Sequence, residues 1–491
     1  MPAILGANSV SGEFQVTNGI RLNGSDEYLS RTLEAPTSSR TFTVSAWIKG
    51  NFKRSGSSDS PIMSVGASGD HDYTNLPSFI RTEGTPTIYI SDTDNDADGD
   101  TGIYLHFNNG PELQDPTAWI HVLLAIDTTQ GTAANRIKLY LNGEQVPNDI
   151  ASHNSNYPAQ NYDIPGLANG QTIHVGAEVQ GSTHRFSGYM CEHHYIDGQA
   201  LAPTAFGKFQ EDTGIWVPIR YTGTFGNSGH RLEFKQTGTS ANASGQGADT
   251  SGNANHFTCN GLETHNIVQD TCTNNFCTWN PLDTGSGTTF STGNLDTDTG
   301  DNKNDVGTIG LTSGKWYFEV KYAGAAIAGW QSEHLAAQNL NGTNLNDNHG
   351  SVAYSTYHGA VFHNSSTDGT MSNDRDGGTI GVAFDLDNNK AYWHVDGTYI
   401  DIASGTQNPA TEANPITIRS TNTDVHPSYT EAFYFPKLAA GSSSQTMQTN
   451  FGNPTFNPSS GNADGAGYGN FEFSVPSGYY SICTQNIAKY S

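Results

Sequence analysis

Charged residues are scarce in this chain of 491 residues, and basic residues are scarcer than acidic ones. Only 14% of the residues are charged, with 22 Lys and Arg against 48 Asp and Glu, whereas soluble domains usually have roughly 25%. The net charge of -26 repels phosphate backbones and anionic lipid headgroups, so we expect neither nucleic acid nor membrane as a partner. Solubility must come from Asn, Ser, Thr and Gly, a composition that favours β-structure over long helices.

Cysteine is also rare. The five cysteines are Cys191, Cys259, Cys272, Cys277 and Cys483. An odd number without regular spacing is no disulfide framework, and the Cys272–Cys277 spacing without a second pair argues against zinc. We therefore expect reduced, mostly buried thiols.

The sequence lacks two kinds of apolar segment. Residues 1–11 have neither the basic start nor the apolar core of a signal peptide. No apolar run could span a bilayer, so membrane insertion is not expected. These features predict synthesis in a cytosol without export by the general route.

Strand signals recur in the first half of the chain. Residues 41–49 alternate apolar and polar side chains with a period of two, as in a half-buried strand. Residues 136–141 alternate likewise and lead into Asn142-Gly143, the favoured pair for a tight hairpin turn. Residues 119–126 form a continuous apolar run, which predicts a central strand covered on both faces.

The second half carries its own strand signals. Trp316, Phe318 and Val320 alternate within residues 314–320, and residues 379–386 repeat this pattern. A turn at residues 387–390 leads into a strand at 391–395, and Asp396-Gly397 closes the next hairpin. We therefore predict an all-β chain of two antiparallel β-sandwiches.

The two halves are separated by residues 237–255, which have no large apolar side chain and no usable period. Such a segment buries too little surface to offset its ordering entropy, so it predicts a polar surface loop or hinge. The expected organisation is one sandwich at 1–236, a linker and connector at 237–284, and a second sandwich at 285–491.

Several motifs of the first half carry a resemblance to a known family. Gly19–Asn23, Phe42–Trp47 and the Leu139–Gly143 hairpin resemble the concanavalin A-like, or laminin-G-like, jelly roll over about residues 8–235. The tract from Phe186-Ser187-Gly188-Tyr189 to Asp197-Gly198-Gln199, followed by Trp216-Val217-Pro218, resembles the end of this jelly roll in structural proteins of marine tailed bacteriophages. The connector Gln269–Asp283 is similar to one that those proteins share.

The second half resembles the SPRY (B30.2) sandwich over about residues 285–487. The strand pair at 314–320 and 379–386 is similar to the core of that domain, and Asn450-Phe451-Gly452 with Pro476–Tyr479 matches its usual end. Two tracts depart from the family pattern, namely Ala336–Tyr357 and Asn408–Tyr429. Both are predicted to be extended loops, which on a rigid sandwich often carry recognition.

These resemblances imply a phage virion protein, a fibre or surface appendage that is assembled in the host cytoplasm. They imply binding to other virion proteins and to a host-surface glycan or protein, without catalysis, and a homo-oligomer that by family analogy is a trimer. Two alternatives stay open. One is a purely structural role, as a capsid decoration or tail connector, and the other is a polysaccharide depolymerase.

An acidic stretch is the candidate metal site. Asp92, Asp94, Asp96, Asp98 and Asp100 stand at every second position, beside Gly99. Carboxylates so spaced could bind calcium, and 94–99 fit the first half of a calcium loop. The position that would supply a bidentate Glu is Leu105, so the alternative is a solvated acidic loop.

Catalytic patterns are missing. A glycosidase needs two carboxylates held across the scissile bond, yet no Glu-x-Asp-x-x-Glu pattern occurs, and Glu178 is alone in its predicted strand at 175–179. In the predicted strand at 189–196, alternation places Cys191 and His193 on one face and Glu192 and His194 on the other. A metal site there is possible, but strand packing is the simpler interpretation.

Aromatic side chains in predicted loops could stack on sugar rings, or could pack in the core or its rim. These residues are Tyr73, Tyr89, Tyr104, Tyr157, Tyr162, Tyr354 and Tyr357.

Overall fold

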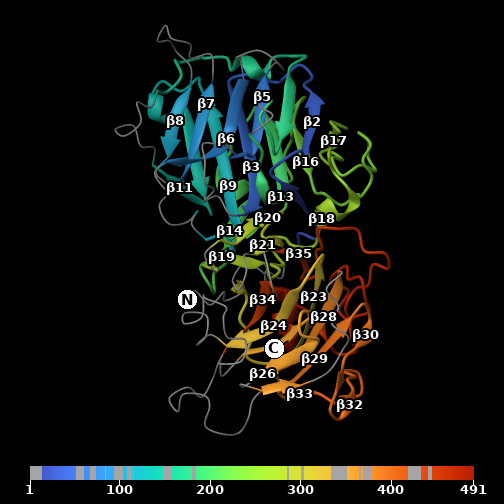
Figure 1. Ribbon diagram of the computed structural model, residues 1–491. Helices are drawn as coiled ribbons and strands as arrows, with labels where there is room; N and C mark the ends of the chain where they lie inside the picture. Colours follow the sequence, from blue (N-terminus) through green and yellow to red (C-terminus); the bar gives the residue numbers. More distant parts are fainter. Residues whose placement is uncertain are drawn as a thin grey trace. The chain divides into compact units, whose positions relative to one another are not determined.

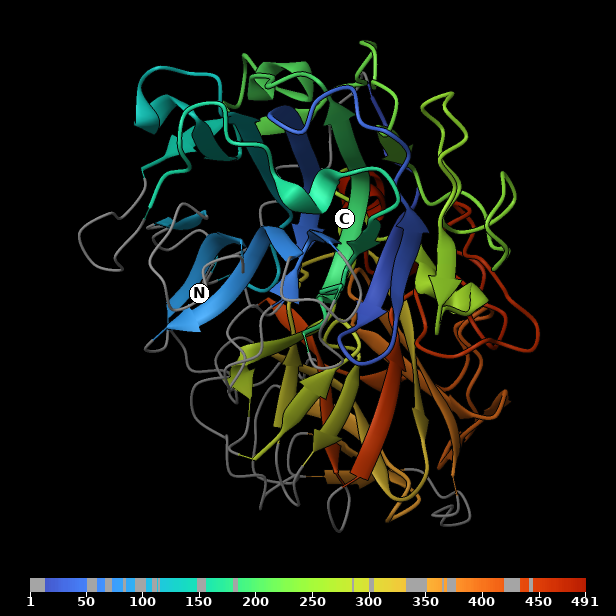
Figure 2. The ribbon, with the colours of Figure 1, turned by 90° about the horizontal axis from the view of Figure 1, so that it is seen from above.

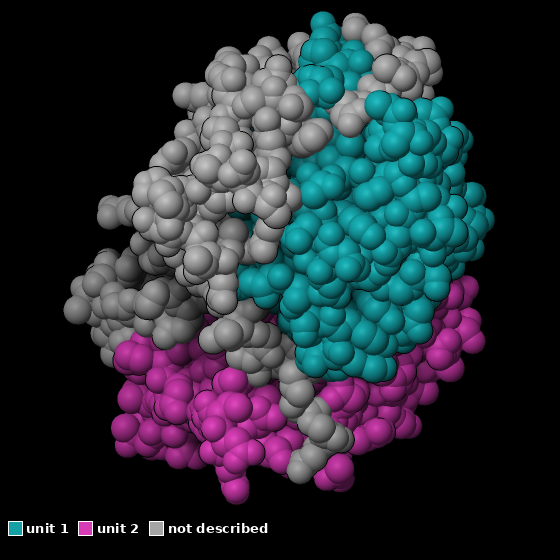
Figure 3. Space-filling view, turned by 90° about the horizontal axis from the view of Figure 1, so that it is seen from below, with its two compact units in different colours: residues 1–7, 275–491 teal, residues 8–274 magenta. Residues whose placement is uncertain are grey.

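The computed structural model describes most of the chain. The described residues are 14–50, 60–66, 73–82, 85–92, 103–107, 113, 115–147, 156–179, 184–284, 287–299, 304–332, 351–363, 366–368, 377–418, 433–440 and 445–491. The chain divides between Asn274 and Asn275 into two compact units (Figure 3). Each unit is a β-sandwich, so the predicted all-β fold of antiparallel sandwiches is confirmed.

The first sandwich has two large sheets (Figure 1). One has the order β11 (Glu144–Val146), β10 (Ile137–Leu141), β9 (Ile120–Asp127), β3 (Thr41–Lys49), β13 (Ser187–Asp197), β1 (Gly19–Asn23) and β18 (Ile267–Val268), with β16 (His230–Leu232) paired to β13. The other has the order β17 (Thr258–Asn260), β2 (Tyr28–Thr32), β12 (Thr172–Val175), β5 (Met63–Gly66), β6 (Tyr73–Thr82), β7 (Thr85–Asp92) and β8 (Tyr104–Phe107), with β4 (Ser60–Pro61) paired to β6. A small sheet joins β14 (Gly207–Phe209) to β15 (Trp216–Pro218). The green strand β13 lies between the blue strands β1 and β3 in this sheet, although both of them come much earlier in the sequence (Figures 1 and 2).

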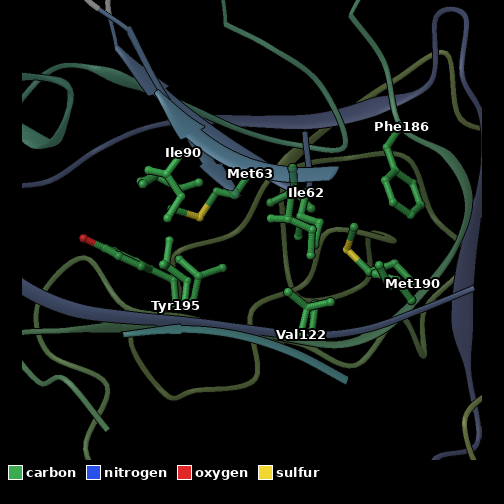
Figure 4. Packing of buried hydrophobic residues seen from close by; sticks show 14 of the residues in the cluster. Ile62, Met63, Ile90, Val122, Phe186, Met190 and Tyr195 are labelled. Atoms are coloured by element: carbon green, nitrogen blue, oxygen red, sulfur yellow. The ribbon is translucent and has the colours of Figure 1, made fainter. Parts of the chain in front are cut away.

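Alternating apolar residues of both sheets fill the space between them. Met63 and Ile90 come from one sheet, and Val122, Met190 and Tyr195 come from the other (Figure 4). All five side chains are at most 1% exposed. Because the strand period is two, every second residue of a strand reaches this core while its neighbours face away.

The second sandwich also has two large sheets. One has the order β19 (Trp279–Thr284), β22 (Asn304–Gly307), β34 (Tyr434–Ala440), β24 (Ala326–Ser332), β25 (Ser351–Ser355), β26 (Ala360–His363) and β27 (Ser366–Asp368). The other has the order β20 (Thr289–Ser291), β21 (Asp296–Thr299), β35 (Gln445–Asn450), β23 (Lys315–Tyr322), β28 (Gly378–Asp385), β29 (Lys390–Val395) and β30 (Thr398–Tyr399), with β33 (Ile416–Thr417) paired to β29 and β36 (Tyr480–Ser481) paired to β23. A small sheet joins β31 (Asp401–Ile402) to β32 (Gly405–Thr406). Its core contains stacked rings, such as Trp330 and Phe384 with centroids 4.3 Å apart.

Helices are short throughout the described ranges. They are the 3-10 turns η2 (Ala133–Asn135), η3 (Pro165–Leu167), η4 (Pro203–Ala205) and η5 (Thr264–Asn266), and the α-helix α2 (Thr484–Tyr490). Within those ranges, no helix has the length and apolar character needed to cross a membrane.

Residues 237–255 correct the expected division of the chain. They lack long strands, but Gly245–Asp249 are buried, and the backbone N–H of Phe257 donates to the carbonyl of Gly247. A Cβ on Gly247 would lie 2.7 Å from that of Phe257, so glycine lets the backbone lie directly against the core. The carboxylate of Asp249 accepts hydrogen bonds from the backbone N–H groups of Arg231, Ser251 and Asn255. Residues 237–274 therefore belong to the first sandwich, and the boundary is at Asn274–Asn275 instead of across a linker at 237–284.

The two predicted long loops are also partly corrected. Of Ala336–Tyr357, residues 351–355 form β25, and 336–350 lie outside the described residues. Of Asn408–Tyr429, residues 416–417 form β33, and 419–429 lie outside the described residues.

Candidate functional site

A polar row crosses the outer face of the sheet that contains β2 and β12. The two residues that flank His174 on β12 belong to the core, so His174 faces away from it. In the strand register His174 stands opposite Ser30 of β2 and Ser64 of β5, and Thr258 of β17 stands opposite Ser30. Hydroxyl groups and an imidazole therefore line this side of the sheet.

Tyr28 supplies an aromatic plate beside this row. Its ring centroid lies 4.8 Å from that of His174, and the guanidinium of Arg185 lies 4.7 Å from the Tyr28 ring centroid. Asn260 stands opposite Tyr28, and its amide Nδ2 donates to Oγ of Ser30 at 2.9 Å. Tyr28, Ser30 and Asn260 are half-buried, which leaves part of each accessible. We call Tyr28, Ser30, His174, Thr258 and Asn260 the polar face.

The segment after β12 fixes one end of the polar face. Nδ1 of His174 lies 3.1 Å from the carbonyl oxygen of Glu178, and Nδ1 of His184 lies 2.5 Å from Oε2 of Glu178. Burial lowers the pKa of His174 despite that carbonyl contact, so its ring is neutral at neutral pH. A neutral Nδ1 beside a carbonyl carries the proton, so Nε2 is the acceptor of this ring.

The geometry corrects one expectation about Glu178. It does not lie in a strand at 175–179, because β12 ends at Val175. The carboxylate instead pairs with His184 and is only 2% exposed. A partly accessible tyrosine, hydroxyls and an amide suit the binding of an uncharged, hydroxyl-rich ligand.

The opposite sheet shows a second correction, at β13. Its pairing with β3 shifts between Cys191, opposite Trp47, and His194, opposite Ser45. Glu192 has φ 49, so a bulge in this strand inserts an extra residue. Because Trp47 and Ser45 share one face of β3, Cys191 and His194 also share a face, contrary to simple alternation.

The histidines and acids around this bulge pack against one another through hydrogen bonds, an ion pair and ring stacking. Arg231 donates to both carboxylate oxygens of Glu192 at 2.8–3.0 Å and forms an ion pair with Glu233 at 3.1 Å. The rings of His193 and His230 stack with centroids 5.2 Å apart, and Nε2 of His230 lies 3.2 Å from Nδ1 of His193. Burial lowers the pKa of both histidines, and all five residues are at most 8% exposed.

A buried polar network in the second sandwich was not predicted from the sequence. The hydroxyl of Tyr317 donates to Oε1 of Glu319 at 3.0 Å and lies 2.8 Å from Nε2 of His394. The same carboxylate accepts hydrogen bonds from the backbone N–H groups of Glu472 and Phe473 at 2.9 and 2.8 Å. Glu319 thus attaches the C-terminal segment to β23. A signal was present, since Glu319 stands between two core residues in a strand, where a carboxylate needs partners.

The calcium site at residues 92–100 stays a prediction. Asp92 ends β7, opposite Thr74, while Asp94, Asp96, Asp98 and Asp100 lie outside the described residues. In the part of the chain that the structure describes, no group of three or more His, Cys, Asp or Glu could hold a metal ion. All five cysteines are free, and all except the half-buried Cys259 are buried.

The predicted loop aromatics separate into three groups. Tyr73, Tyr89 and Tyr104 lie in strands β6, β7 and β8 instead of loops. Tyr157 and Tyr162 are partly buried against the first core. Tyr354 is buried on β25, whereas Tyr357 is half-buried in the turn after it. Tyr28, the aromatic ring of the polar face, was missed because it lies in a short strand without an obvious surface signal.

Comparison with known proteins gives a family match for part of the chain. Residues 23–203 match the model described as the concanavalin A-like lectin/glucanases superfamily. A search of the curated proteins found no match.

Solved structures with similarity to the chain include a native heptameric SAP-like pentraxin from Limulus polyphemus, with 18% identity over 38% of this chain and 80% of that chain, at a TM-score of 0.27. They also include the SPRY domain of human HERC1, with 14% identity over 35% of this chain and 96% of that chain, at a TM-score of 0.26. The stonustoxin structure matches with 16% identity over 35% of this chain and 27% of that chain, at a TM-score of 0.26. The family match at residues 23–203 indicates a lectin- and glucanase-like β-sandwich within the first unit, a class suited to binding carbohydrate or protein.

Proposed function

We propose that this protein is a non-enzymatic virion protein of a tailed bacteriophage, part of a fibre or surface appendage, and that its polar face binds a glycan of the host surface. The observation that carries the binding proposal is the partly accessible Tyr28 beside the hydroxyls of Ser30 and Thr258 and the amide of Asn260. An aromatic plate takes the apolar face of a sugar ring, and the neighbouring groups bond its hydroxyls.

The virion assignment is supported by sequence resemblance. The tract from Phe186 to Gln199 and the connector Gln269–Asp283 resemble segments of marine phage structural proteins. The family match at residues 23–203 supports a binding role, because sandwiches of this superfamily include lectins. The superfamily also includes glucanases, but Glu178, beside the polar face, is paired with His184 and buried, which does not suit a general acid or nucleophile.

The test of the binding role uses purified full-length protein on an array of bacterial surface polysaccharides, followed by calorimetry on any glycan that binds. Replacing Tyr28 with Ala removes the stacking plate and is expected to weaken binding roughly 2- to 10-fold, as an aromatic contact of about 0.5–1.5 kcal/mol predicts. Phe209, which is 45% exposed on β14, provides a control for loss of an exposed ring, and Phe209→Ala should bind as the wild type does.

The virion role is tested separately, with purified phage particles. Mass spectrometry should find the protein in the particles, and antibody labelling in electron micrographs should place it on an external appendage. Absence from purified particles contradicts the virion proposal. Binding to virion proteins without glycan binding would support a structural connector, and release of reducing ends from polysaccharide would support a depolymerase.

A further inference from the structure

A lysine and an aspartate from distant parts of the first sandwich meet in a buried position on the face of the β3 sheet that points away from the core. Lys49 is the last residue of β3, and Asp270 follows β18, 221 positions later in the chain. Nζ of Lys49 lies 2.5 Å from Oδ2 of Asp270, and the side chains are 1% and 2% exposed. This pair has no part in the polar face, which lies on the other sheet.

Aromatic rings surround the amine. Nζ of Lys49 lies 4.7 Å from the ring centroid of Tyr189 and 5.8 Å from that of Trp119. The indole N–H of Trp119 donates to the second carboxylate oxygen of Asp270, Oδ1, at 3.1 Å. The two carboxylate oxygens are thus differentiated, with Oδ1 facing an N–H donor and Oδ2 facing the amine.

The backbone around Asp270 is held in place by its neighbours. Oγ1 of Thr271 and of Thr273 donate to the carbonyl of Val16 at 2.8 and 3.0 Å, and Thr273 accepts from the N–H of Val16 at 3.0 Å. Lys49 is fixed by the pairing of β3 with β13, where it stands opposite Tyr189. Amine and carboxyl are therefore fixed at contact distance, the condition under which intramolecular reactions reach high effective concentrations.

Condensation requires the neutral forms of both groups. Burying an ammonium and a carboxylate costs desolvation energy that their attraction repays only in part. Transfer of one proton from Lys49 to Asp270 gives a neutral amine and a neutral carboxylic acid, the forms that can condense. An amide has no net charge, so condensation removes the buried ion pair altogether.

We propose that Lys49 and Asp270 form an intramolecular isopeptide bond. Nζ of Lys49 attacks Cγ of Asp270, the Cγ–Oδ2 bond breaks, and Oδ2 leaves as water with two protons from the original ammonium. The third proton stays on the new amide nitrogen. Oδ1 becomes the amide carbonyl oxygen and keeps its hydrogen bond from Trp119, so the reaction needs no oxidant, cofactor or second protein.

The bond joins the end of β3 to the segment that leads out of the first sandwich at Asn274. It closes a covalent loop over most of this unit, which reduces the freedom of the unfolded chain as a long-range disulfide does. The closing segment then cannot be pulled away from the sheet without breaking a covalent bond. The free cysteines provide no such cross-link.

Intact mass spectrometry of the full-length protein tests the proposal. The wild type should be lighter than its sequence mass by one water molecule, and a proteolytic digest should contain one branched peptide that joins Lys49 to Asp270. Lys49→Arg and Asp270→Ala should both have their full sequence masses and no branched peptide. Asp270→Asn is the matched control for the chemistry, since loss of ammonia from the amide would give the same product mass as the wild type.

Folding is checked by circular dichroism and by a cooperative melt, and the wild type itself is the decisive sample. Folded wild type that keeps its full sequence mass and yields only linear peptides, both when fresh and after prolonged incubation at 37 °C, overturns the proposal. A water loss that persists in Asp270→Ala also overturns it, because the loss would then come from another residue.

Discussion

Gly381 and His394 stand opposite each other on β28 and β29, and a Cβ on Gly381 would lie 1.9 Å from Nε2 of His394. Gly381 also stands opposite Glu319 of β23, so one row contains the acid, the glycine and the histidine. The missing side chain lets the histidine ring lie across β28 and reach the Tyr317 hydroxyl at 2.8 Å. Glycine is required here by the close approach of a ring.

Replacing Gly381 with Ala should destabilise the second sandwich by roughly 1–3 kcal/mol, because the methyl group displaces the ring and breaks its bond to Tyr317. Urea denaturation of the full chain measures the loss. Gly465→Ala is the control, since its Cβ would meet only Cε1 of Tyr480, at an ordinary 3.7 Å, and it should be nearly neutral. Equal stability of the two variants would contradict the proposed role of Gly381.

The direction of the hydrogen bonds among Glu319, Tyr317 and His394 follows from which ring nitrogen of His394 carries the proton. Burial lowers its pKa to about 4, so the ring is neutral at neutral pH. Nδ1 accepts from the backbone N–H of Gly397 at 3.2 Å, so Nε2 carries the proton. Nε2 therefore donates to the oxygen of Tyr317, whose own proton goes to Glu319.

Glu319 should make stability depend on pH. Burial, opposed by four hydrogen-bond donors, raises its pKa from 4.5 to about 7. The folded protein thus binds this proton more tightly than the unfolded chain, so the contribution is complete below pH 4.5 and is lost as the pH rises through 7. From pH 5 to pH 8 the wild type should lose up to about 3 kcal/mol more stability than Glu319→Gln, at about 1.4 kcal/mol for each pKa unit.

Urea denaturation of both proteins at several pH values checks this slope. His394 titrates in both proteins, so its effect cancels in the difference. Parallel pH profiles for the wild type and Glu319→Gln would show that the carboxyl is ionised across the whole range.

Much of the fold could be predicted from the sequence because strand period and turn chemistry are local. The predicted strand at 41–49 is β3, and the Asn142-Gly143 turn has φ 46 and 86, as a type I′ hairpin requires. The bulge at Glu192 could not be predicted, because it depends on which residue of β3 each residue of β13 meets.

The polar face was missed for a similar reason. Tyr28, His174 and Asn260 come from three separate strands that meet only in the folded sheet.

The packing of residues 237–255 shows the limit of composition as evidence. Low hydrophobicity predicts a surface loop or hinge, but here hydrogen bonds to Asp249 and the close approach of Gly247 to Phe257 order the segment. Hydrogen bonds between backbone groups and side chains can join residues that are distant in the sequence, and the amino-acid content of a segment does not reveal them.

Arg231 should be the most sensitive charged residue near the bulge. It is 2% exposed and holds Glu192, which is 5% exposed, with a two-point hydrogen bond. Arg231→Gln leaves a buried carboxylate without its cation and should cost about 3–5 kcal/mol. The double variant Glu192→Gln/Arg231→Gln should recover part of this loss, because it removes both charges.

A double-mutant cycle by urea denaturation measures the coupling between Glu192 and Arg231. Lys235, which is 48% exposed in its ion pair with Glu233, supplies a surface control. Lys235→Gln should change stability by less than about 1 kcal/mol. Additive effects at Glu192 and Arg231 would mean that the pair contributes no more than its separate contacts.

The acidic stretch from Asp92 to Asp100 gives the last prediction, which rests on the sequence alone. Two carboxylates about 4 Å apart repel by roughly 4 kcal/mol at an effective dielectric constant near 20, so an ordered cluster needs a cation. At an extracellular type of affinity, with Kd about 10⁻⁴–10⁻³ M, millimolar calcium would occupy the site. A tenfold excess of calcium over Kd would then stabilise the protein by about 1.4 kcal/mol.

The measurement is the melting temperature of the full chain with calcium and with a chelator, in the wild type and in Asp94→Asn/Asp96→Asn/Asp98→Asn. A calcium-dependent rise in the wild type that is lost in the triple variant supports the site. An equal rise in both would place the calcium elsewhere, and no rise in either would mean that the stretch is a solvated acidic loop.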